Sequence, residues 1–355
     1  MTDLAVFTAT MAHQRPPRLL YYAKFSQDLQ RRLVAHTGRA DVEEYFGFFR
    51  PVVLAPKRPP DIAPPDYSSY WADRPLPTGT TFNSDGVAMV PSGFYHFWGY
   101  VSPLSEAESL SEIEQYPLDD LSRFDYSHMA DIVAGAHAAG GVVMGSIGHI
   151  YERAWQIRGY EQFLVDLLER PAWAECLLER ICCQNIIKAE AYARVGADYL
   201  FCGDDVANQN NLMFAPKIWR KFIHSRWQRV WEAARRINPR IHIWYHSDGN
   251  IISIIPELIE AGVDILNPLQ PECLDVDAVY RSYGDRIVFD GTIGTQSTMP
   301  FGTPTDVRAR VREVVEKYGE HGGLIISPTH LLEPDVPIAN VEAFVDACRE
   351  YGALT

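Results

Sequence analysis

Cysteine motifs, long apolar runs and targeting signals are all scarce in this chain. Six cysteines occur among 355 residues, and none of them forms a Cys-x-x-Cys pair. We therefore expect buried free thiols in a reducing compartment and no disulfide framework. No stretch reaches the roughly 18 apolar residues of a membrane span. Residues 1–17 lack the apolar core and the cleavage site of a signal peptide. These absences predict a cytoplasmic protein with no membrane partner.

Positive charge is also in short supply. The chain has 32 Lys and Arg against 46 Asp and Glu, a formal net charge of −14. No basic patch balances this charge, which argues against nucleic acid and anionic membranes as partners. A strongly anionic substrate is not favoured either, although a local arginine cluster could still bind one. No glycine-rich dinucleotide or P-loop motif follows any expected strand.

The composition is that of an ordinary globular protein, with 47% hydrophobic and 22% charged residues. From residue 140 onward, short apolar runs alternate with amphipathic segments, and this alternation predicts a parallel sheet built from β-α units. The expected strands cover residues 18–23, 141–148, 198–203, 242–245, 264–268, 286–290 and 323–327. The expected helices lie within 152–196 and at 216–237, 252–261, 276–283, 305–318 and 338–351.

About six such units plus the early strand fit a (β/α)8 TIM barrel better than an open doubly wound sheet. We expect one barrel domain over residues 1–355 with an elaborated N-terminal part. Eight prolines between Pro51 and Pro77 predict an irregular surface excursion and no helix. Residues 80–91 look like a β-hairpin around Asp85-Gly86. Together these segments predict a lid-like insertion over residues 51–100.

Polar residues follow most of the expected strands, at the barrel face where active sites lie. They are His149, Glu152, Asp204, Asp205, His246, Asp248, Asn267, Gln270, Asp290 and His330. Structural roles compete with functional ones at each position. Asp248 could cap a helix beginning at residues 250–251, and Asp204 with Asp205 could fix the loop before Leu212.

Two histidines and one carboxylate stand out among these residues. His246 and Asp248 end one expected strand, and His330 ends another. Alternate residues of an extended segment point the same way, so His246 and Asp248 can face one site. Two imidazoles with one carboxylate are ligands for zinc or a similar divalent metal. The sequence therefore predicts a metal site formed by His246, Asp248 and His330.

The chain also resembles the uroporphyrinogen decarboxylase superfamily. The resemblance rests on residues 260–270 (EAGVDILNPLQ), on 196–199 with 203–205, and on Ile326-Ser327-Pro328. It implies a (β/α)8 barrel and one of two chemistries: porphyrinogen decarboxylation, or zinc-dependent methyl transfer linked to a corrinoid. It further implies a possible homodimer, because many members of the superfamily form dimers.

The decarboxylases of the superfamily carry an arginine-rich segment, RQAGRY, soon after the first strand. Residues 21–26 read YYAKFS here, so the arginine pair is missing and decarboxylation of a porphyrinogen is not expected. The methyltransferases carry His-x-Cys-Gly and a later Cys after a Ser/Ala-Pro-Gly turn. These positions read 246–249 HSDG and 327–330 SPTH. The resemblance therefore makes His246 a ligand and places Asp248 and His330 where thiolates usually stand.

A site with two histidines and a carboxylate is harder than one with thiolates and suits an oxygen ligand. We expect a metal-dependent methyltransferase that moves a methyl group between a small O-methyl compound, possibly aromatic, and a corrinoid carried by a partner protein. Glu152, Asp204 and Asp205 are the expected catalytic residues. Glu152, or one of Asp204 and Asp205, could complete the ligand shell of the metal or protonate the leaving oxygen. Contacts to the corrinoid or to an aromatic ring are expected from Tyr95, His96, Trp98, Asn267 and Gln270.

Two other functions remain open at this point. A metal-free decarboxylase or lyase on the same barrel would use Asp204 or Asp205 with arginines facing the pocket. A non-catalytic protein that binds a corrinoid protein or a small molecule is the second, because a fold does not fix a function. The aromatic run at residues 94–98 is compatible with core packing as well as with a ligand wall.

Overall fold

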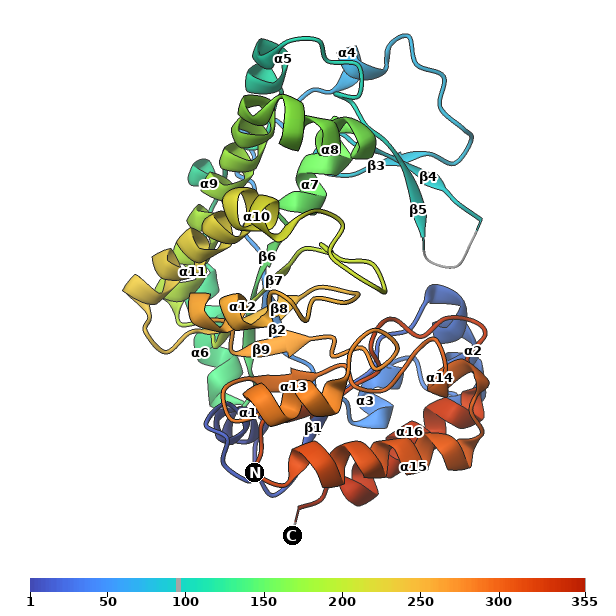
Figure 1. Cartoon of the computed structure of the whole chain (residues 1–355). Coiled ribbons are helices and arrows are strands. Elements are labelled where there is room, and N and C mark those ends of the chain that lie inside the picture. Colours follow the sequence, from blue (N-terminus) through green and yellow to red (C-terminus); the bar gives the residue numbers. More distant parts are fainter. Residues whose placement is uncertain (94–96, 355) are drawn as a thin grey trace.

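A computed structural model describes residues 1–93 and 97–354. Its main feature is a parallel sheet of eight strands that curls into a barrel (Figure 1), which confirms the predicted fold class. The strand order is β1-β11-β10-β9-β8-β7-β6-β2. The strands are β1 (Leu20–Tyr21), β2 (Val52–Leu54), β6 (Val143–Gly148), β7 (Tyr199–Gly203), β8 (His242–His246), β9 (Ile265–Asn267), β10 (Val288–Asp290) and β11 (Leu324–Ile326).

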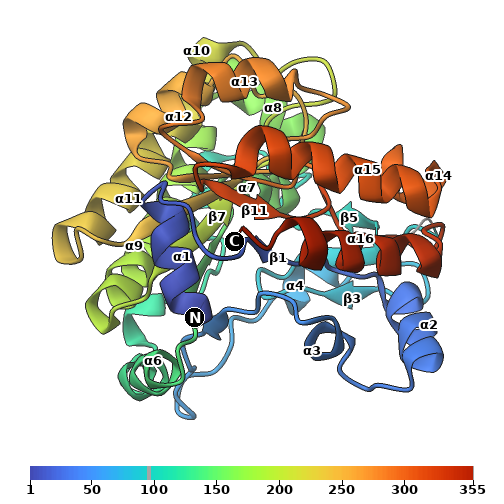
Figure 2. The same cartoon turned by 90° about the horizontal axis from the view of Figure 1, so that it is seen from below.

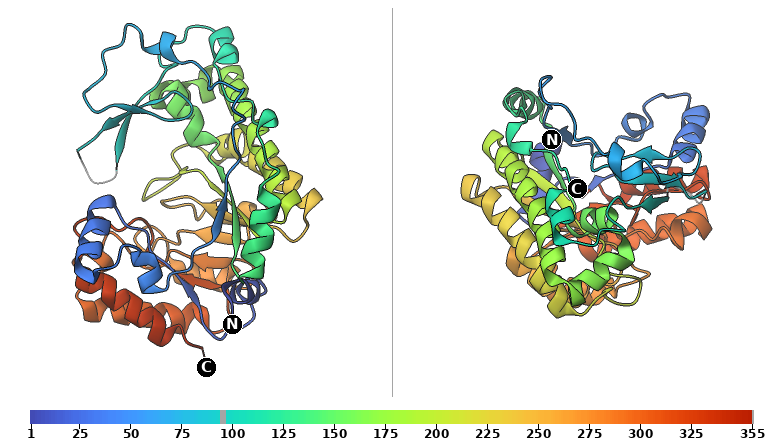
Figure 3. Two further views of the ribbon diagram at one scale, coloured as in Figure 1. Left: turned by 180° about the vertical axis from the view of Figure 1, so that it is seen from behind. Right: turned by 90° about the horizontal axis from the view of Figure 1, so that it is seen from above.

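The barrel has a seam between β1 and β2. Strand β1 pairs with β11, and β2 pairs with β6, which runs beside it in the view from behind (Figure 3). Within residues 1–93 and 97–354, no ladder joins β1 to β2. The main chain of Phe49 bridges part of this gap, because its amide donates to the carbonyl of Tyr21 at 2.8 Å.

Helices cover the outside of the sheet. The principal ones are α6 (Met129–Ala138), α7 (Tyr151–Arg158), α8 (Tyr160–Glu169), α9 (Pro171–Val195), α11 (Ser225–Ile237), α12 (Ile255–Ala261), α13 (Val276–Tyr283), α15 (Pro304–Val314) and α16 (Ile338–Tyr351). Shorter ones are α2 (Gln27–Thr37), α3 (Val42–Phe46), α5 (Leu110–Gln115), α10 (Pro216–Trp219) and α14 (Thr298–Phe301). Local sequence sets several ends. Helix α9 begins at Pro171 and stops at Gly196 in a left-handed conformation, and Thr303 with Asp306 forms a capping box for α15.

Helix α1 (Asp3–Met11) closes the amino-terminal end of the barrel (Figure 2). Its buried Val6 and Phe7 join a core cluster with side chains from inside the sheet, among them Leu20, Tyr199 and Trp244. The Phe7 and Tyr199 ring centroids lie 5.6 Å apart. Because this end is filled with apolar side chains, the opposite end of the barrel is the one left for polar chemistry.

The prediction for residues 51–77 is wrong at two places. This segment starts with β2, a strand of the barrel itself, and later forms the short helix α4 (Ser68–Trp71). Three residues with one buried side chain, Leu54, are too short to show a strand pattern between prolines. Part of the predicted lid-like insertion is therefore barrel wall.

The predicted hairpin at residues 80–91 is confirmed. Strands β3 (Thr81–Phe82) and β4 (Ala88–Pro91) pair antiparallel, and β5 (Trp98–Val101) adds a third strand. In Figure 1 this small sheet lies beside α7 and α8, apart from the barrel strands.

The helix expected at residues 252–261 begins later than predicted, at Ile255. Residues 252–254 form a turn, and Ile254 at the N-cap makes no side-chain capping bond. Asp248 therefore does not cap this helix, and that structural alternative is wrong. Within the described residues, no helix is both long enough and apolar enough to cross a membrane.

Candidate metal centre

The ends of β7 and β8 are held together closely enough to share one site. Gly203 pairs with His246 in the parallel ladder, and a Cβ on Gly203 would lie only 2.1 Å from the carbonyl oxygen of His246. Only glycine fits such a close backbone approach. This register places the residues that follow β7 directly opposite those that follow β8.

Three donor side chains, Asp205, His246 and Asp248, have ligand atoms within 4.8 Å of one another at this edge of the barrel, and a fourth adjoins them. The His246 Nε2 atom lies 3.6 Å from Asp205 Oδ1 and 4.0 Å from Asp248 Oδ1. The ring of His330 joins them from the loop after β11, with its Nε2 3.9 Å from Asp248 Oδ2. The rings of His246 and His330 have centroids 6.4 Å apart. The structure thus brings together all three residues predicted as ligands and adds Asp205.

A chain of hydrogen bonds fixes the orientation of His246. Its Nδ1 lies 2.6 Å from Oδ1 of Asn267, whose Nδ2 donates to Asp290 Oδ2 at 2.6 Å. Because Asp290 takes the amide donor, Asn267 presents its oxygen to His246 and the proton sits on Nδ1. The lone pair of Nε2 then faces Asp205 and Asp248. This is the arrangement that supports a metal-ligating histidine.

Asp290 anchors this chain from inside the barrel. It is fully buried and accepts hydrogen bonds from four groups: Ser327 at 2.6 Å, Asn267 at 2.6 Å, Tyr22 at 2.8 Å and the Trp244 indole at 3.1 Å. Burial raises the pKa of Asp290 to about 6, and the bonds from Ser327, Tyr22 and Asn267 oppose this rise. The carboxylate is therefore ionised at neutral pH and holds the amide of Asn267 in one orientation.

The donor set suits a divalent metal. Two ligand atoms of a tetrahedral zinc ion with bonds of 2.0–2.1 Å are roughly 3.4 Å apart. The distances from His246 Nε2 to the two carboxylates are slightly longer than this, so small side-chain movements would complete a shell. Burial disfavours a charged His246, yet Asp248, Asp205 and the bond with Asn267 outweigh burial and raise the pKa of His246. The negative potential that raises this pKa would equally stabilise a bound cation.

A second polar group lies next to the first, where α7 begins. His149 Nδ1 lies 2.6 Å from Glu152 Oε2 and 2.8 Å from the carbonyl oxygen of Gly203. Burial works against the His149 cation, but Glu152, Asp204 and Asp205 outweigh it and raise the pKa of His149 to about 9. Burial also raises the pKa of Glu152, and the pairing with His149 overcomes it and lowers the pKa. An imidazolium and a carboxylate are therefore expected here at neutral pH.

Asp204 holds this region together from behind. Its Oδ1 accepts from the backbone amides of Ile150 and Glu152 at 3.0 and 3.1 Å, and its Oδ2 accepts from the Trp227 indole at 2.7 Å. The side chain is fully buried. Burial raises the pKa of Asp204 to about 7. Both oxygens are engaged, so Asp204 positions the start of α7 and does not face the crevice.

A cavity of about 380 Å³ opens above these groups. Side chains from both polar groups line it together with Asn267, Tyr22, Lys24 and Phe201. Within the described residues, no arginine lines this cavity. A metal-free decarboxylase would need arginines here, so this lining gives that alternative no support.

The remaining predicted contacts lie in other surroundings. Gln270 is buried and accepts from the amide of Gly249 at 3.3 Å, so it fixes the loop after Asp248. Asn267 contacts Nδ1 of His246 and also lines the cavity. Trp98 is 40% exposed on β5. Tyr95 and His96 lie outside the described residues.

Asp205 is the residue for which the sequence left two roles open, in the metal shell or in catalysis. Its Oδ1 lies closer to His246 Nε2 than the carboxylate of Asp248 does. Its Oδ1 also accepts from the amide of Asp248 at 2.8 Å. If Gly203 is aligned with His246 in two neighbouring parallel strands, Asp205 lies opposite Asp248, so this alignment would have predicted their proximity.

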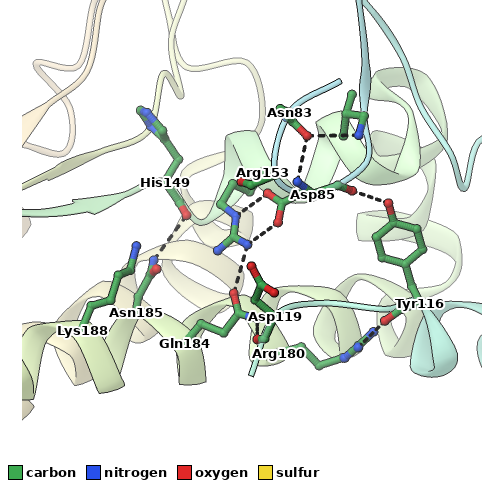
Figure 4. A network of polar contacts seen from close by, with 12 residues as sticks. Asn83, Asp85, Tyr116, Asp119, His149, Arg153, Arg180, Gln184, Asn185 and Lys188 are labelled. Carbon is green, nitrogen blue, oxygen red and sulfur yellow. Dashed lines mark hydrogen bonds and ion pairs between the residues drawn. The ribbon is translucent and has the colours of Figure 1, made fainter. Parts of the chain in front are cut away.

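A buried ion pair ties the three-stranded sheet to α7 (Figure 4). Arg153 donates from Nε and Nη2 to the carboxylate of Asp85 at 2.8 and 2.6 Å, and from Nη2 to Gln184 at 3.0 Å. Further along α9, Asn185 donates to the carbonyl oxygen of His149 at 3.3 Å. The turn between β3 and β4 is thereby linked to the helix that carries Glu152.

Comparisons with known proteins agree with this architecture. The family described as uroporphyrinogen decarboxylase (URO-D) matches residues 102–351, more than half of the chain. The chain belongs to the uroporphyrinogen decarboxylase family. A uroporphyrinogen decarboxylase of Coxiella burnetii is 22% identical over 188 residues, which are 52% of this chain and 49% of the relative. One of Psychromonas ingrahamii is 30% identical over 77 residues, 22% of this chain and 21% of the relative.

These alignments cover about half or less of the curated relatives. Among solved structures, a methyltransferase from Methanosarcina mazei superposes with a TM-score of 0.68 over 99% of both chains at 18% identity. At that identity the superposition establishes a shared fold. Membership of the uroporphyrinogen decarboxylase family confirms the resemblance seen in the sequence.

Proposed function

We propose that this protein is a metal-dependent methyltransferase. It would move a methyl group between a small O-methyl compound and a corrinoid carried by a partner protein. The observation that carries the proposal is the cluster of Asp205, His246 and Asp248 at the mouth of a barrel of this family. His330 adjoins this cluster through its contact with Asp248 at 3.9 Å. The shared fold with a methyltransferase of Methanosarcina mazei supports it.

The ligands proposed for the metal are His246 with Asp248, His330 and Asp205. A divalent cation held by them would act as a Lewis acid and make the leaving oxygen less basic. Carboxylates in place of thiolates favour a hard cation and an oxygen ligand over a thiol. This preference is why an O-methyl compound is proposed as the methyl donor.

The His149–Glu152 pair is proposed to supply the proton that the leaving oxygen takes up. An aryl methyl ether that gives up its methyl group leaves a phenoxide, whose conjugate acid has a pKa of about 10 in water, as for tyrosine. An imidazolium with a pKa of about 9 is well matched to donate a proton to such an oxygen. Glu152 holds the imidazolium through its 2.6 Å contact.

Metal content of purified variants tests the proposal. We expect about one equivalent of zinc or a similar metal in the wild-type protein and a large loss in His246→Ala and His330→Ala. His36→Ala is the matched control, because His36 is an exposed histidine that contacts Glu342 on the surface. Full metal retention in both site variants would contradict the proposal.

A further inference from the structure

A second cavity lies in the seam between β1 and β2. It measures about 500 Å³. Three side chains, Tyr22, Lys24 and Phe201, line both this seam cavity and the cavity above the metal centre. The two hollows therefore adjoin at these residues. The seam cavity exists because no ladder between β1 and β2 is found in residues 1–93 and 97–354.

The wall of the seam cavity is aromatic. Six rings line it: Tyr22, Phe48, Phe49, Tyr199, Phe201 and Trp244. The rings of Tyr199 and Trp244 lie 4.9 Å apart, and Phe201 lies 6.3 Å from Trp244 and 6.3 Å from His246. This chain of rings leads from the seam to the proposed metal ligand. The hydrogen bond from Trp244 to Asp290 fixes the orientation of the indole ring. The aromatic wall can therefore stack against a planar ligand.

Lys24 brings a positive charge to the border of the two cavities. Its Nζ lies 5.4 Å from the centroid of the Phe201 ring. No carboxylate of the described residues lies within ion-pair distance of this ammonium, and its side chain is exposed. Arg50, the other cation of the seam cavity, contacts Asp41 at 2.7 Å and Glu43 at 3.2 Å. The Lys24 ammonium can therefore bind an anionic ligand, whereas the Arg50 guanidinium is already paired with Asp41 and Glu43.

We propose that the seam cavity binds an aromatic carboxylate, with the Lys24 ammonium on the carboxylate and the ring against Phe201 and Trp244. This inference rests on the proposed function and names its substrate class: an aromatic acid that carries a methoxy group. A single ammonium matches a single carboxylate. Lys24 is thereby expected to favour a methyl ether that carries a carboxylate over a neutral one.

Binding of benzoate and benzamide to the full-length chain tests the carboxylate contact. The two probes differ in charge and carry no methyl ether. Isothermal titration calorimetry is expected to show benzoate binding to the wild type and to Lys24→Arg. Lys24→Gln is expected to weaken benzoate binding by about 10- to 100-fold, the effect of losing one charged hydrogen bond. Benzamide binding should be the same in all variants.

Lys57→Gln is the matched control, because it removes the same charge from an exposed lysine outside both cavities. Benzoate affinity should not change in this variant. An equal benzoate affinity in Lys24→Gln and wild type overturns the inference. So does a wild-type protein that binds benzamide as tightly as benzoate, or that binds neither.

Methyl transfer separates this inference from the proposed function. Equal transfer from para-methoxybenzoate and methoxybenzene, with the same KM in Lys24→Gln, contradicts the carboxylate site and leaves the methyltransferase intact. Benzoate binding that depends on Lys24, with no methyl transfer from any methoxy compound, supports the site and contradicts the proposed function.

Discussion

Asn267→Ala is the substitution that most directly tests how the metal centre is built. The side chain makes two hydrogen bonds of 2.6 Å, one with His246 Nδ1 and one to Asp290. Loss of such a partner behind a ligating histidine typically weakens metal binding by about 10- to 100-fold. This factor corresponds to about 1.4 to 2.7 kcal/mol. We expect a zinc Kd raised by that factor, measured by competition with a chromophoric chelator.

A matched control separates this effect from general destabilisation. Asn340 is also a buried asparagine, and its amide donates to the carbonyl oxygens of Met299 and Gly302 at 2.8 and 2.7 Å, away from the metal centre. Both Asn→Ala variants should lose about 1 to 3 kcal/mol of unfolding free energy, because each removes two hydrogen bonds from buried groups. Asn267→Ala leaves the Nδ1 proton of His246 without its acceptor and takes one donor from Asp290, whereas Asn340→Ala leaves two carbonyl oxygens without a donor. Only Asn267→Ala should change the zinc Kd. A wild-type zinc Kd in Asn267→Ala would refute the role of this chain of hydrogen bonds.

Three other outcomes follow from buried groups around the site. Burial and the nearby Arg153 lower the pKa of Lys188 to about 7, so the folded state holds fewer protons there than the unfolded state above that pH. Wild-type unfolding free energy should rise relative to Lys188→Met by about 1 kcal/mol per pH unit between pH 7 and 10, and chemical denaturation at several pH values measures this. Asp85→Asn should cost about 3 to 5 kcal/mol because it removes the carboxylate charge that balances the Arg153 guanidinium. Limited proteolysis should then cut residues 56–93 faster, and an unchanged rate would contradict the proposed link to α7. Trp227→Phe removes the donor to Asp204 and should lower unfolding free energy by about 1 to 3 kcal/mol in urea titrations.

The sequence predicted the parts of the fold that repeat. Strands from β6 to β11 are apolar runs followed by polar turns, and periodicity identifies such runs. Strand β2 is too short for any period, and its place in the barrel comes from pairing with β6. The start of α12 was predicted too early because residues 252–254 form a turn in place of a first helical turn.

Part of the candidate site could be predicted from the sequence. His246, Asp248 and His330 could be proposed from their places at strand ends, and the structure brings them together. Asn267 and Asp205 gain their positions through contacts across β7, β8, β9 and β10, which a single sequence does not contain. The same holds for the seam cavity and for Lys24, because the gap between β1 and β2 is a feature of how the strands pair in the part of the chain that the structure describes.

Formation of methylcobalamin tests the central claim most directly. Zinc-loaded protein is mixed with free cob(I)alamin and para-methoxybenzoate, and the absorbance change from cob(I)alamin to methylcobalamin is followed. We expect transfer by the wild type, loss of transfer after zinc is removed by a chelator and recovery when zinc returns. His246→Ala should be inactive and His36→Ala active. Transfer at the wild-type rate by the zinc-free protein or by His246→Ala would contradict a metal-dependent methyltransferase.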